Sequence, residues 1–131
     1  MLPVRRATVA TLVSMSTHEA ASIDDPATSP FEFAQAAAAV IAEKTGVERH
    51  DIALTLGSGW GQTADLLGET IATIPADEVP GFAKSDIPGH SGTLRSIRLA
   101  NGKHALVIAA RTHYYEGKGV RRVVHSVRTA A

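Results

Sequence analysis

The residues best suited to chemistry stand together in segment 111–117, which reads Arg-Thr-His-Tyr-Tyr-Glu-Gly. This segment follows an apolar run at 105–109 that is typical of a buried strand, and ligands of open α/β sheets bind where such strands end. Arg111 can hold a phosphate through two parallel hydrogen bonds, and Thr112 and His113 add donors beside it. The segment therefore predicts an anion site. The plainer alternative is that its tyrosines pack on the core and its charges face water.

A second candidate is the turn Gly57-Ser58-Gly59, which lies between an apolar run and a short helical pattern. Glycines let backbone N–H groups approach an anion, a helix start adds partial positive charge, and the Ser58 hydroxyl is a further donor. The turn matches neither the dinucleotide fingerprint nor the P-loop, because no lysine follows the glycines. It predicts a phosphate contact without cleavage of a nucleoside triphosphate, and a plain tight turn is the alternative.

His90 is a third candidate, because it follows Pro88-Gly89 in a long segment rich in glycine and proline. A histidine on such a loop suits a lid over a site, although a lone histidine is also compatible with no role. The other histidines outside segment 111–117 are interpreted as surface or packing residues: His18, His50, His104 and His125. No pair of histidines has metal-ligand spacing on one element, so we expect no metal.

A helix precedes these candidates in the chain. Ser29, Pro30 and Glu32 form a capping-box start, which predicts a helix from Pro30 to about Thr45. Gly46 provides the left-handed stop. Helical spacing places the following residues on its core face: Phe33, Ala37, Val40 and Ile41.

Strand patterns alternate with short helical ones after this point. The run 52–56 is apolar, which predicts a strand covered on both faces of a sheet. We expect a short helix over 60–67, ended by Gly68, and a short strand over 70–74. Segment 75–92 is punctuated by proline and glycine too often for either, so it is expected to be a loop, ordered or disordered.

A hairpin is predicted over 93–110, because two strand-like runs flank Asn101-Gly102. We expect a two-residue turn there, with the run 105–109 inside the sheet. Segment 111–119 is a polar loop at its exit, and valines then recur at helical spacing: Val120, Val123, Val124 and Val127. Together these elements predict an α/β fold, a mixed β-sheet flanked by helices, and a valine stripe that another element must cover.

Length and composition limit the class of protein. The chain has 131 residues, no cysteine and equal numbers of basic and acidic residues, 13 of each. These values suit one globular domain without disulfides. A formal net charge of zero argues against a protein that binds nucleic acid mainly through an overall positive charge. No apolar run is long enough to span a bilayer.

Both ends of the sequence raise expectations about the complete protein. Arg5 and Arg6 precede an apolar stretch, but Thr8 and Thr11 interrupt it and no cleavage site follows, so we expect a cytoplasmic protein. Translation from Met15 is an alternative start, and residues 1–29 are expected to be a disordered or extended lead-in. The last helix opens a βαβ unit without closing it, so more chain is expected to follow.

The candidate segments resemble trimeric purine nucleoside phosphorylases in their order and spacing. The matching segments are LGSG at 56–59, PGF at 80–82, PGHSG at 88–92 and RTHYYEG at 111–117. The resemblance extends from about Phe31 to Ala131 and covers the amino-terminal half of such an enzyme, so residues 30–131 are interpreted as an incomplete nucleoside-phosphorylase-like domain. The chain departs from the family pattern at Ala110, where glycine is usual, and at Trp60, where leucine is common.

The resemblance implies phosphorolysis, in which inorganic phosphate displaces a purine from a ribonucleoside or deoxyribonucleoside to give the pentose 1-phosphate. It implies no cofactor beyond the phosphate co-substrate, and a homotrimer when the chain is complete. The residues that it implies for phosphate binding are Ser58, His90, Arg111, Thr112 and His113. Tyr115 would lie against the sugar, His90 would also act in catalysis, and Glu116 would orient its loop and the neighbouring histidine.

The same resemblance places purine recognition later in the chain of such enzymes, on a glutamate and an asparagine for which this sequence has no positions. It therefore implies a phosphate and ribose half-site, leaves the purine preference open, and predicts little or no activity of this chain alone. A second chain could supply the missing half. The alternatives are a non-catalytic remnant or interaction module that keeps the half-site and, ranked lower, a methylthioadenosine phosphorylase.

Overall fold

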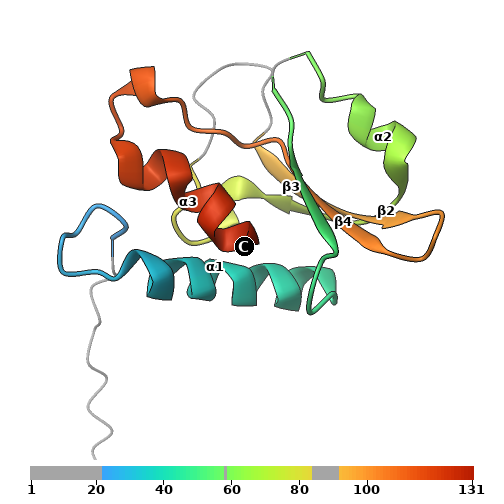
Figure 1. Cartoon of the computed structure of the whole chain (residues 1–131), viewed down its shortest axis with the longest axis horizontal. Helices are drawn as coiled ribbons and strands as arrows, with labels where there is room; N and C mark the ends of the chain where they lie inside the picture. Colours follow the sequence, from blue (N-terminus) through green and yellow to red (C-terminus); the bar gives the residue numbers. More distant parts are fainter. Residues whose placement is uncertain (1–21, 58, 84–91) are drawn as a thin grey trace, which may run out of the picture.

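The protein forms a mixed four-stranded sheet with helices on both faces (Figure 1). The computed structural model describes residues 22–57, 59–83 and 92–131. Ser58 and His90 lie outside these described residues. The elements are α1 (Pro30–Thr45), β1 (Ile52–Thr55), α2 (Thr63–Leu67), β2 (Gly68–Pro75), β3 (Thr93–Leu99), β4 (His104–Ile108) and α3 (Val120–Ala130), with 3-10 turns at Ala76–Glu78 and Tyr114–Glu116. The predicted α/β class with a mixed sheet is confirmed.

The strand order is β1-β4-β3-β2, with β1 parallel to β4 and the other pairs antiparallel. Strand β4 thus has a neighbour on each side. Its side chains alternate between the two faces, so Leu106 and Ile108 pack in a core with Ile41 of α1, whereas Ala105 and Val107 pack with Ala64 of α2. The predicted burial of this run is confirmed for residues 105–108, whereas Ala109 is exposed beyond the end of the strand.

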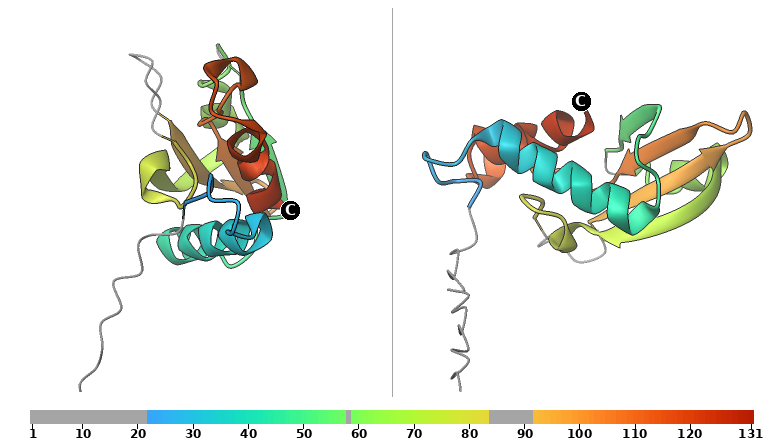
Figure 2. Two further views of the ribbon diagram at one scale, coloured as in Figure 1. Left: turned by 90° about the vertical axis from the view of Figure 1, so that its left-hand side faces the viewer. Right: turned by 90° about the horizontal axis from the view of Figure 1, so that it is seen from below.

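Helix α1 begins and ends where its capping residues predict. The Glu32 backbone N–H donates to the Ser29 hydroxyl at 3.4 Å, and Gly46 adopts a φ of +69° and donates to the Ala42 carbonyl. The buried face differs slightly from the expected one, because Ala34, rather than Phe33, is buried with Ala37 and Ile41. Helices α1 and α3 lie side by side (Figure 2). Phe33 is half-buried between them, with its ring centroid 5.6 Å from that of His125.

Strand β1 is not covered on both faces, so that expectation is wrong. Ile52 is 46% exposed, and only Leu54 of the strand is half-buried. The reason is its position: β1 lies at the edge of the sheet, and β4 is its one extensive neighbour among the described residues. An apolar run predicts a strand, but its burial depends on neighbours that other parts of a chain provide.

The hairpin between β3 and β4 is confirmed, but its predicted two-residue turn is wrong. Leu99 pairs with Lys103, and the Gly102 N–H donates to the Leu99 carbonyl at 2.9 Å, so the loop holds three residues. Gly102 has a φ of +81°, whereas Asn101 does not have a positive φ. This is a type I turn followed by a left-handed glycine, the usual three-residue hairpin.

Helix α2 is shorter than predicted, because residues 60–62 form a turn in which the Thr63 N–H donates to the Trp60 carbonyl. The helix ends at Leu67 with Gly68 at its C-cap position, as predicted, and Gly68 is extended and also begins β2, which is longer than the predicted strand over 70–74. A Cβ at Gly68 would lie 2.1 Å from the Arg98 carbonyl oxygen. Glycine is required here by the close approach of β3, not by a helix stop.

Helix α3 packs beside α1 (Figures 1 and 2). Its buried residues are polar, whereas Val123 and Val124 are half-buried. His125, Ser126 and Thr129 are buried, while Val120 and Val127 are 62% and 65% exposed. Residues 22–29 cross the start of α3, where the Arg122 guanidinium forms a two-pronged ion pair with Asp24 and Arg121 donates to the Asp25 carbonyl. Among the described residues, nothing covers the exposed part of the valine stripe.

Candidate anion-binding site

The ends of the two parallel strands bring the predicted site segments to one edge of the sheet. The Leu56 N–H donates to the Ile108 carbonyl at 3.1 Å, so the chain leaving β1 starts beside the chain leaving β4. Gly57 and Gly59 follow on one side, and the loop that contains Arg111 follows on the other. This adjacency agrees with the rule that parallel strands present their carboxyl ends at a common edge.

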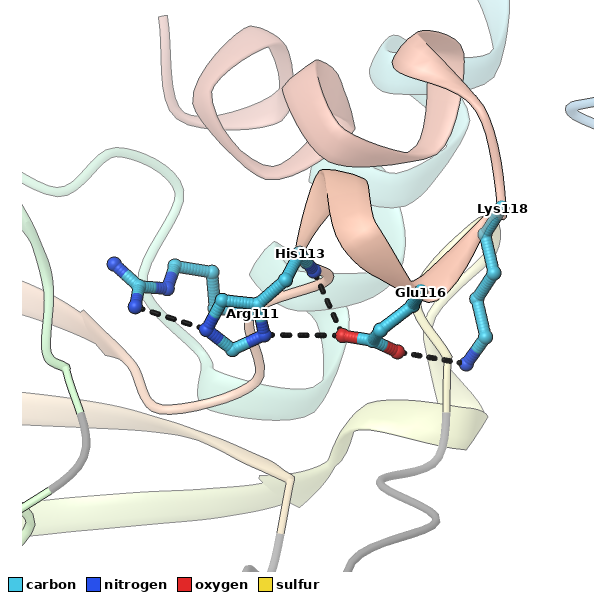
Figure 3. Close-up of polar contacts among 4 residues, drawn as sticks. All are labelled: Arg111, His113, Glu116 and Lys118. Carbon is cyan, nitrogen blue, oxygen red and sulfur yellow. Dashed lines mark hydrogen bonds and ion pairs between the residues drawn. The ribbon is translucent and has the colours of Figure 1, made fainter.

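The polar side chains of the β4 loop form a connected row (Figure 3). Arg111 Nη2 lies 3.0 Å from His113 Nε2, and His113 Nδ1 lies 3.0 Å from Glu116 Oε1. Because a guanidinium can only donate, His113 Nε2 must accept its hydrogen bond, and the ring proton is then assigned to Nδ1, which donates to Glu116. Among the described residues, no other hydrogen-bond partner engages the remaining N–H groups of Arg111, which can donate to an anion.

Glu116 holds the loop as well as the histidine ring. Its Oε1 accepts the His113 backbone N–H at 2.7 Å, and its Oε2 lies 3.2 Å from Lys118 Nζ. The backbone and ring hydrogen bonds from His113, followed by the Lys118 ammonium, lower the pKa of Glu116 from 4.5 to about 2. The carboxylate is therefore ionised throughout the neutral range, and its contacts are those of a group that orients His113.

The two tyrosines of the loop face outward. Tyr115 is 81% exposed, and its ring stacks on His113 with centroids 4.8 Å apart. Tyr114 is similarly exposed, so the plainer interpretation, in which both tyrosines pack on the core, is wrong. Thr112 is half-buried at a small cavity between this loop and α3. A stacked, exposed Tyr115 is free to contact a second ligand beside the anion.

One residue with structural importance was not predicted: Lys118, whose signal is a basic residue between two glycines directly after the loop. His125 was expected to be a surface or packing residue; it is buried, its Nε2–H donates to the Pro80 carbonyl at 2.7 Å, and its Nδ1 has no partner among the described residues. Burial lowers the pKa of His125. A Cβ at Gly81, whose φ is +78°, would lie 2.4 Å from that Nε2.

Other site classes gain no support from the described part of the chain. No group of three possible metal ligands comes together in residues 22–57, 59–83 and 92–131. Within the same ranges, no helix has the length and apolar character needed to cross a bilayer. The fold and the site thus define an α/β domain with a cationic loop at the end of a buried central strand.

Comparison with known proteins shows which proteins the chain resembles. No protein-family model matches the chain. A purine nucleoside phosphorylase of Cellulomonas sp. is 60% identical over 113 residues, which are 83% of this chain and 40% of that protein. The purine nucleoside phosphorylase of Mycobacterium leprae is 49% identical over 77% of this chain and 37% of its own length.

Solved structures agree with these relatives. A purine nucleoside phosphorylase of Schistosoma mansoni, crystallised with acetate, superposes with a TM-score of 0.64 at 32% identity, over 76% of this chain and 35% of that one. A purine nucleoside phosphorylase in complex with ribose 1-phosphate gives a TM-score of 0.65 over 36% of its chain, also at 32% identity. The chain is similar in sequence and fold to the amino-terminal portion of these purine nucleoside phosphorylases. It spans about 40% of the length of its curated relatives and corresponds to their amino-terminal portion.

Proposed function

We propose that this chain forms the phosphate and ribose half-site of a purine nucleoside phosphorylase. The observation that carries the proposal is the row Arg111–His113–Glu116 at the exit of β4, because it presents a guanidinium and an oriented imidazole at one end of the sheet. The reaction class is supported by the similarity of the chain to purine nucleoside phosphorylases of Cellulomonas sp. and Mycobacterium leprae. The complex of one structural relative with ribose 1-phosphate supports the substrate class.

The reaction places a clear demand on the phosphate site. An oxygen of inorganic phosphate forms a bond to C1′ of the nucleoside while the bond from C1′ to the purine nitrogen breaks, and the purine leaves with the electron pair and takes up a proton. Phosphate must therefore be stripped of water and aimed at a carbon that develops oxocarbenium character. Fixed cationic donors position it, and its negative charge stabilises that carbon.

The roles proposed for individual residues follow from this demand. Arg111, Thr112 and His113 bind phosphate, and Tyr115 lies against the sugar. Ser58 and His90 are proposed as further phosphate ligands, and His90 also acts in catalysis; both lie outside the described residues. Glu116 acts through His113, which it orients, so the complete site would lose phosphate affinity without it. The only co-substrate is inorganic phosphate, and no cofactor is proposed.

Purine recognition is proposed to belong to the portion of the relatives that this chain does not span. A homotrimeric, cytoplasmic complete protein is part of the same proposal, which rests on the resemblance. Mass spectrometry of the native amino terminus tests the location. A mature protein that starts near Ala21 would indicate secretion and contradict it.

The decisive experiment measures phosphorolysis. We expect the purified chain to release little or no base from inosine, guanosine or adenosine, because loss of even one group that stabilises developing charge costs about 10² to 10³ in rate. The assay is repeated after mixing in the separately expressed carboxy-terminal portion of the Cellulomonas relative. Turnover only in the mixture supports the half-site, robust turnover by the chain alone shows that the base site is misplaced, and no phosphate-dependent turnover in either contradicts the proposed function.

Arg111 is predicted to contribute most to phosphate affinity. Arg111→Lys keeps the charge but removes the two-pronged contact, and a charge-assisted hydrogen bond contributes about 1.5 to 3 kcal/mol. Affinity for inorganic phosphate should therefore fall by about tenfold or more in the completed enzyme. Arg98→Lys on the exposed hairpin is the matched control, and equal affinity of Arg111→Lys and the unchanged protein would show that the role is wrong.

A further inference from the structure

Lys118 occupies a backbone position that its neighbours fix. Gly117 ends the 3-10 turn Tyr114–Glu116 with a φ of +72°, and Gly119 begins α3 with a φ of +83°. Two left-handed residues around one lysine turn the chain back on itself, which only glycine does without strain. The result is that the Lys118 ammonium lies 3.2 Å from Glu116, only two residues away (Figure 3).

The two oxygens of Glu116 have different partners. Oε1 receives both hydrogen bonds from His113, whereas Oε2 faces Lys118. Both side chains of the ion pair are about three-quarters buried, at 28% and 26% exposed, so the pair is partly shielded from water. Lys118 thus restricts rotation of the carboxylate from the side opposite to the histidine.

The charge of Glu116 creates a difficulty for an anion site. Its carboxylate is hydrogen-bonded to His113, which in turn contacts Arg111, so a negative charge stands one side chain away from the proposed phosphate ligands. An unbalanced carboxylate at such short range repels a phosphate dianion. The Lys118 ammonium offsets this charge without needing to touch the ligand.

We propose that Lys118 is a positioning residue of this site: through Glu116 Oε2 it holds the carboxylate against His113 Nδ1 and cancels the carboxylate's repulsion of a bound anion. This inference deepens the proposed function, because its anion is the phosphate of that function. The proposal has two parts: a positioning part, which concerns the hydrogen bond between Glu116 and His113 and needs no ligand, and a charge-balancing part, which concerns the bound phosphate. Each part is tested by its own measurement.

The first measurement is the tautomer of His113, read from its ring ¹⁵N chemical shifts by NMR at alkaline pH, where imidazoles are neutral. The unchanged chain should show a protonated Nδ1 and a bare Nε2. In Lys118→Met the Nε2–H form should become detectable; the shift is partial because the His113 N–H still holds Oε1. Lys118→Arg should restore the original pattern, and Lys103→Met on the hairpin is the control. An unchanged tautomer in Lys118→Met overturns the positioning role.

The second measurement is a phosphate titration by calorimetry, arranged as a double-mutant cycle. Lys118→Met should weaken affinity for inorganic phosphate about two- to fivefold, the range of a partly exposed ion pair, and Lys118→Arg should restore it. In a Glu116→Gln background, Lys118→Met should weaken phosphate affinity less than it does in the unchanged chain, because the positioning contribution acts through the carboxylate. Equal losses in the two backgrounds would show that Lys118 does not act through Glu116 and would overturn the inference. If the unchanged chain and the completed enzyme both fail to bind phosphate, the proposed function and the charge-balancing part fail together, while the tautomer still decides the positioning part.

Discussion

Strands β4 and β1 are parallel neighbours with similar apolar sequences, yet their side chains differ in burial. Ile108 of β4 is 1% exposed, whereas Ile52 of β1 is 46% exposed. Strand β4 has β1 and β3 beside it and cores on both faces, but β1 has only β4 as an extensive neighbour in the described ranges. The difference teaches that apolar sequence fixes the strand conformation and that topology fixes the burial.

The comparison matters for the site because each strand leads into one candidate segment. The loop from Arg111 to Lys118 follows β4, which has a strand on each side and packed side chains on both faces. The polar side chains of this loop contact one another. The turn that contains Gly57 leaves an edge strand. Arg111 and His113 therefore follow the strand that has a neighbour on each side.

The sharpest test of this contrast replaces the same residue type in both strands. Ile108→Ala should reduce the free energy of unfolding by about 2 to 4 kcal/mol, because it leaves a cavity in the core. Ile52→Ala should reduce it by less than about 1 kcal/mol, since the side chain is half exposed. Urea denaturation followed by circular dichroism measures both. Similar losses in the two variants would mean that β1 is as well buried as β4.

A smaller effect is expected from the hairpin that supplies one of the two neighbours of β4. Gly102→Val places a β-branched residue at a φ of +81°, which should cost about 1 to 3 kcal/mol of stability. No atom blocks a Cβ there, so the cost is one of backbone conformation. Lys103→Val is the adjacent control, and thermal unfolding is the readout. A melting temperature unchanged by Gly102→Val would contradict the left-handed turn.

The smallest effect is a pH dependence confined to the start of β1. His50 Nε2 lies 2.8 Å from the Ser96 hydroxyl of β3, and burial, followed by the nearby His104, lowers the pKa of His50 below 6.5, while Asp51 opposes the shift. A histidine with a lowered pKa in the folded state contributes stability above pH 6.5, and this contribution is lost as the pH falls through the folded value.

Hydrogen exchange can measure this difference within one sample. Between pH 7 and pH 5, protection factors of β1 amides should fall relative to those of β4 amides. His50→Asn should remove the difference while leaving the buried His125, which Arg122 and Arg128 face from α3, to respond as before. Equal loss of protection in both strands would indicate global rather than local loosening.

Local signals explain which parts could be predicted from the sequence. Ser29, Glu32 and Gly46 cap α1 through neighbours within one turn, so the bounds of that helix follow from the residues themselves. The contacts among the site residues could be predicted because these residues lie in one short segment, in which His113 and Glu116 are three residues apart. By contrast, the exposure of β1 and the requirement for Gly68 depend on which strand lies alongside, and the burial of His125 depends on its packing with Phe33 and Phe82.

The approach of Gly81 to His125 couples two positions that are 44 residues apart in sequence numbering. Any side chain at position 81 would overlap the imidazole, and any larger ring at position 125 would meet the backbone of residue 81. The two sites therefore cannot diversify independently: an engineered library that varies one and keeps the other will mostly sample chains in which α3 has moved. A smaller residue at 125 would relieve only part of this conflict, because a Cβ at position 81 would also lie 2.8 Å from Phe33 Cε1 and a φ of +78° strains any side chain there.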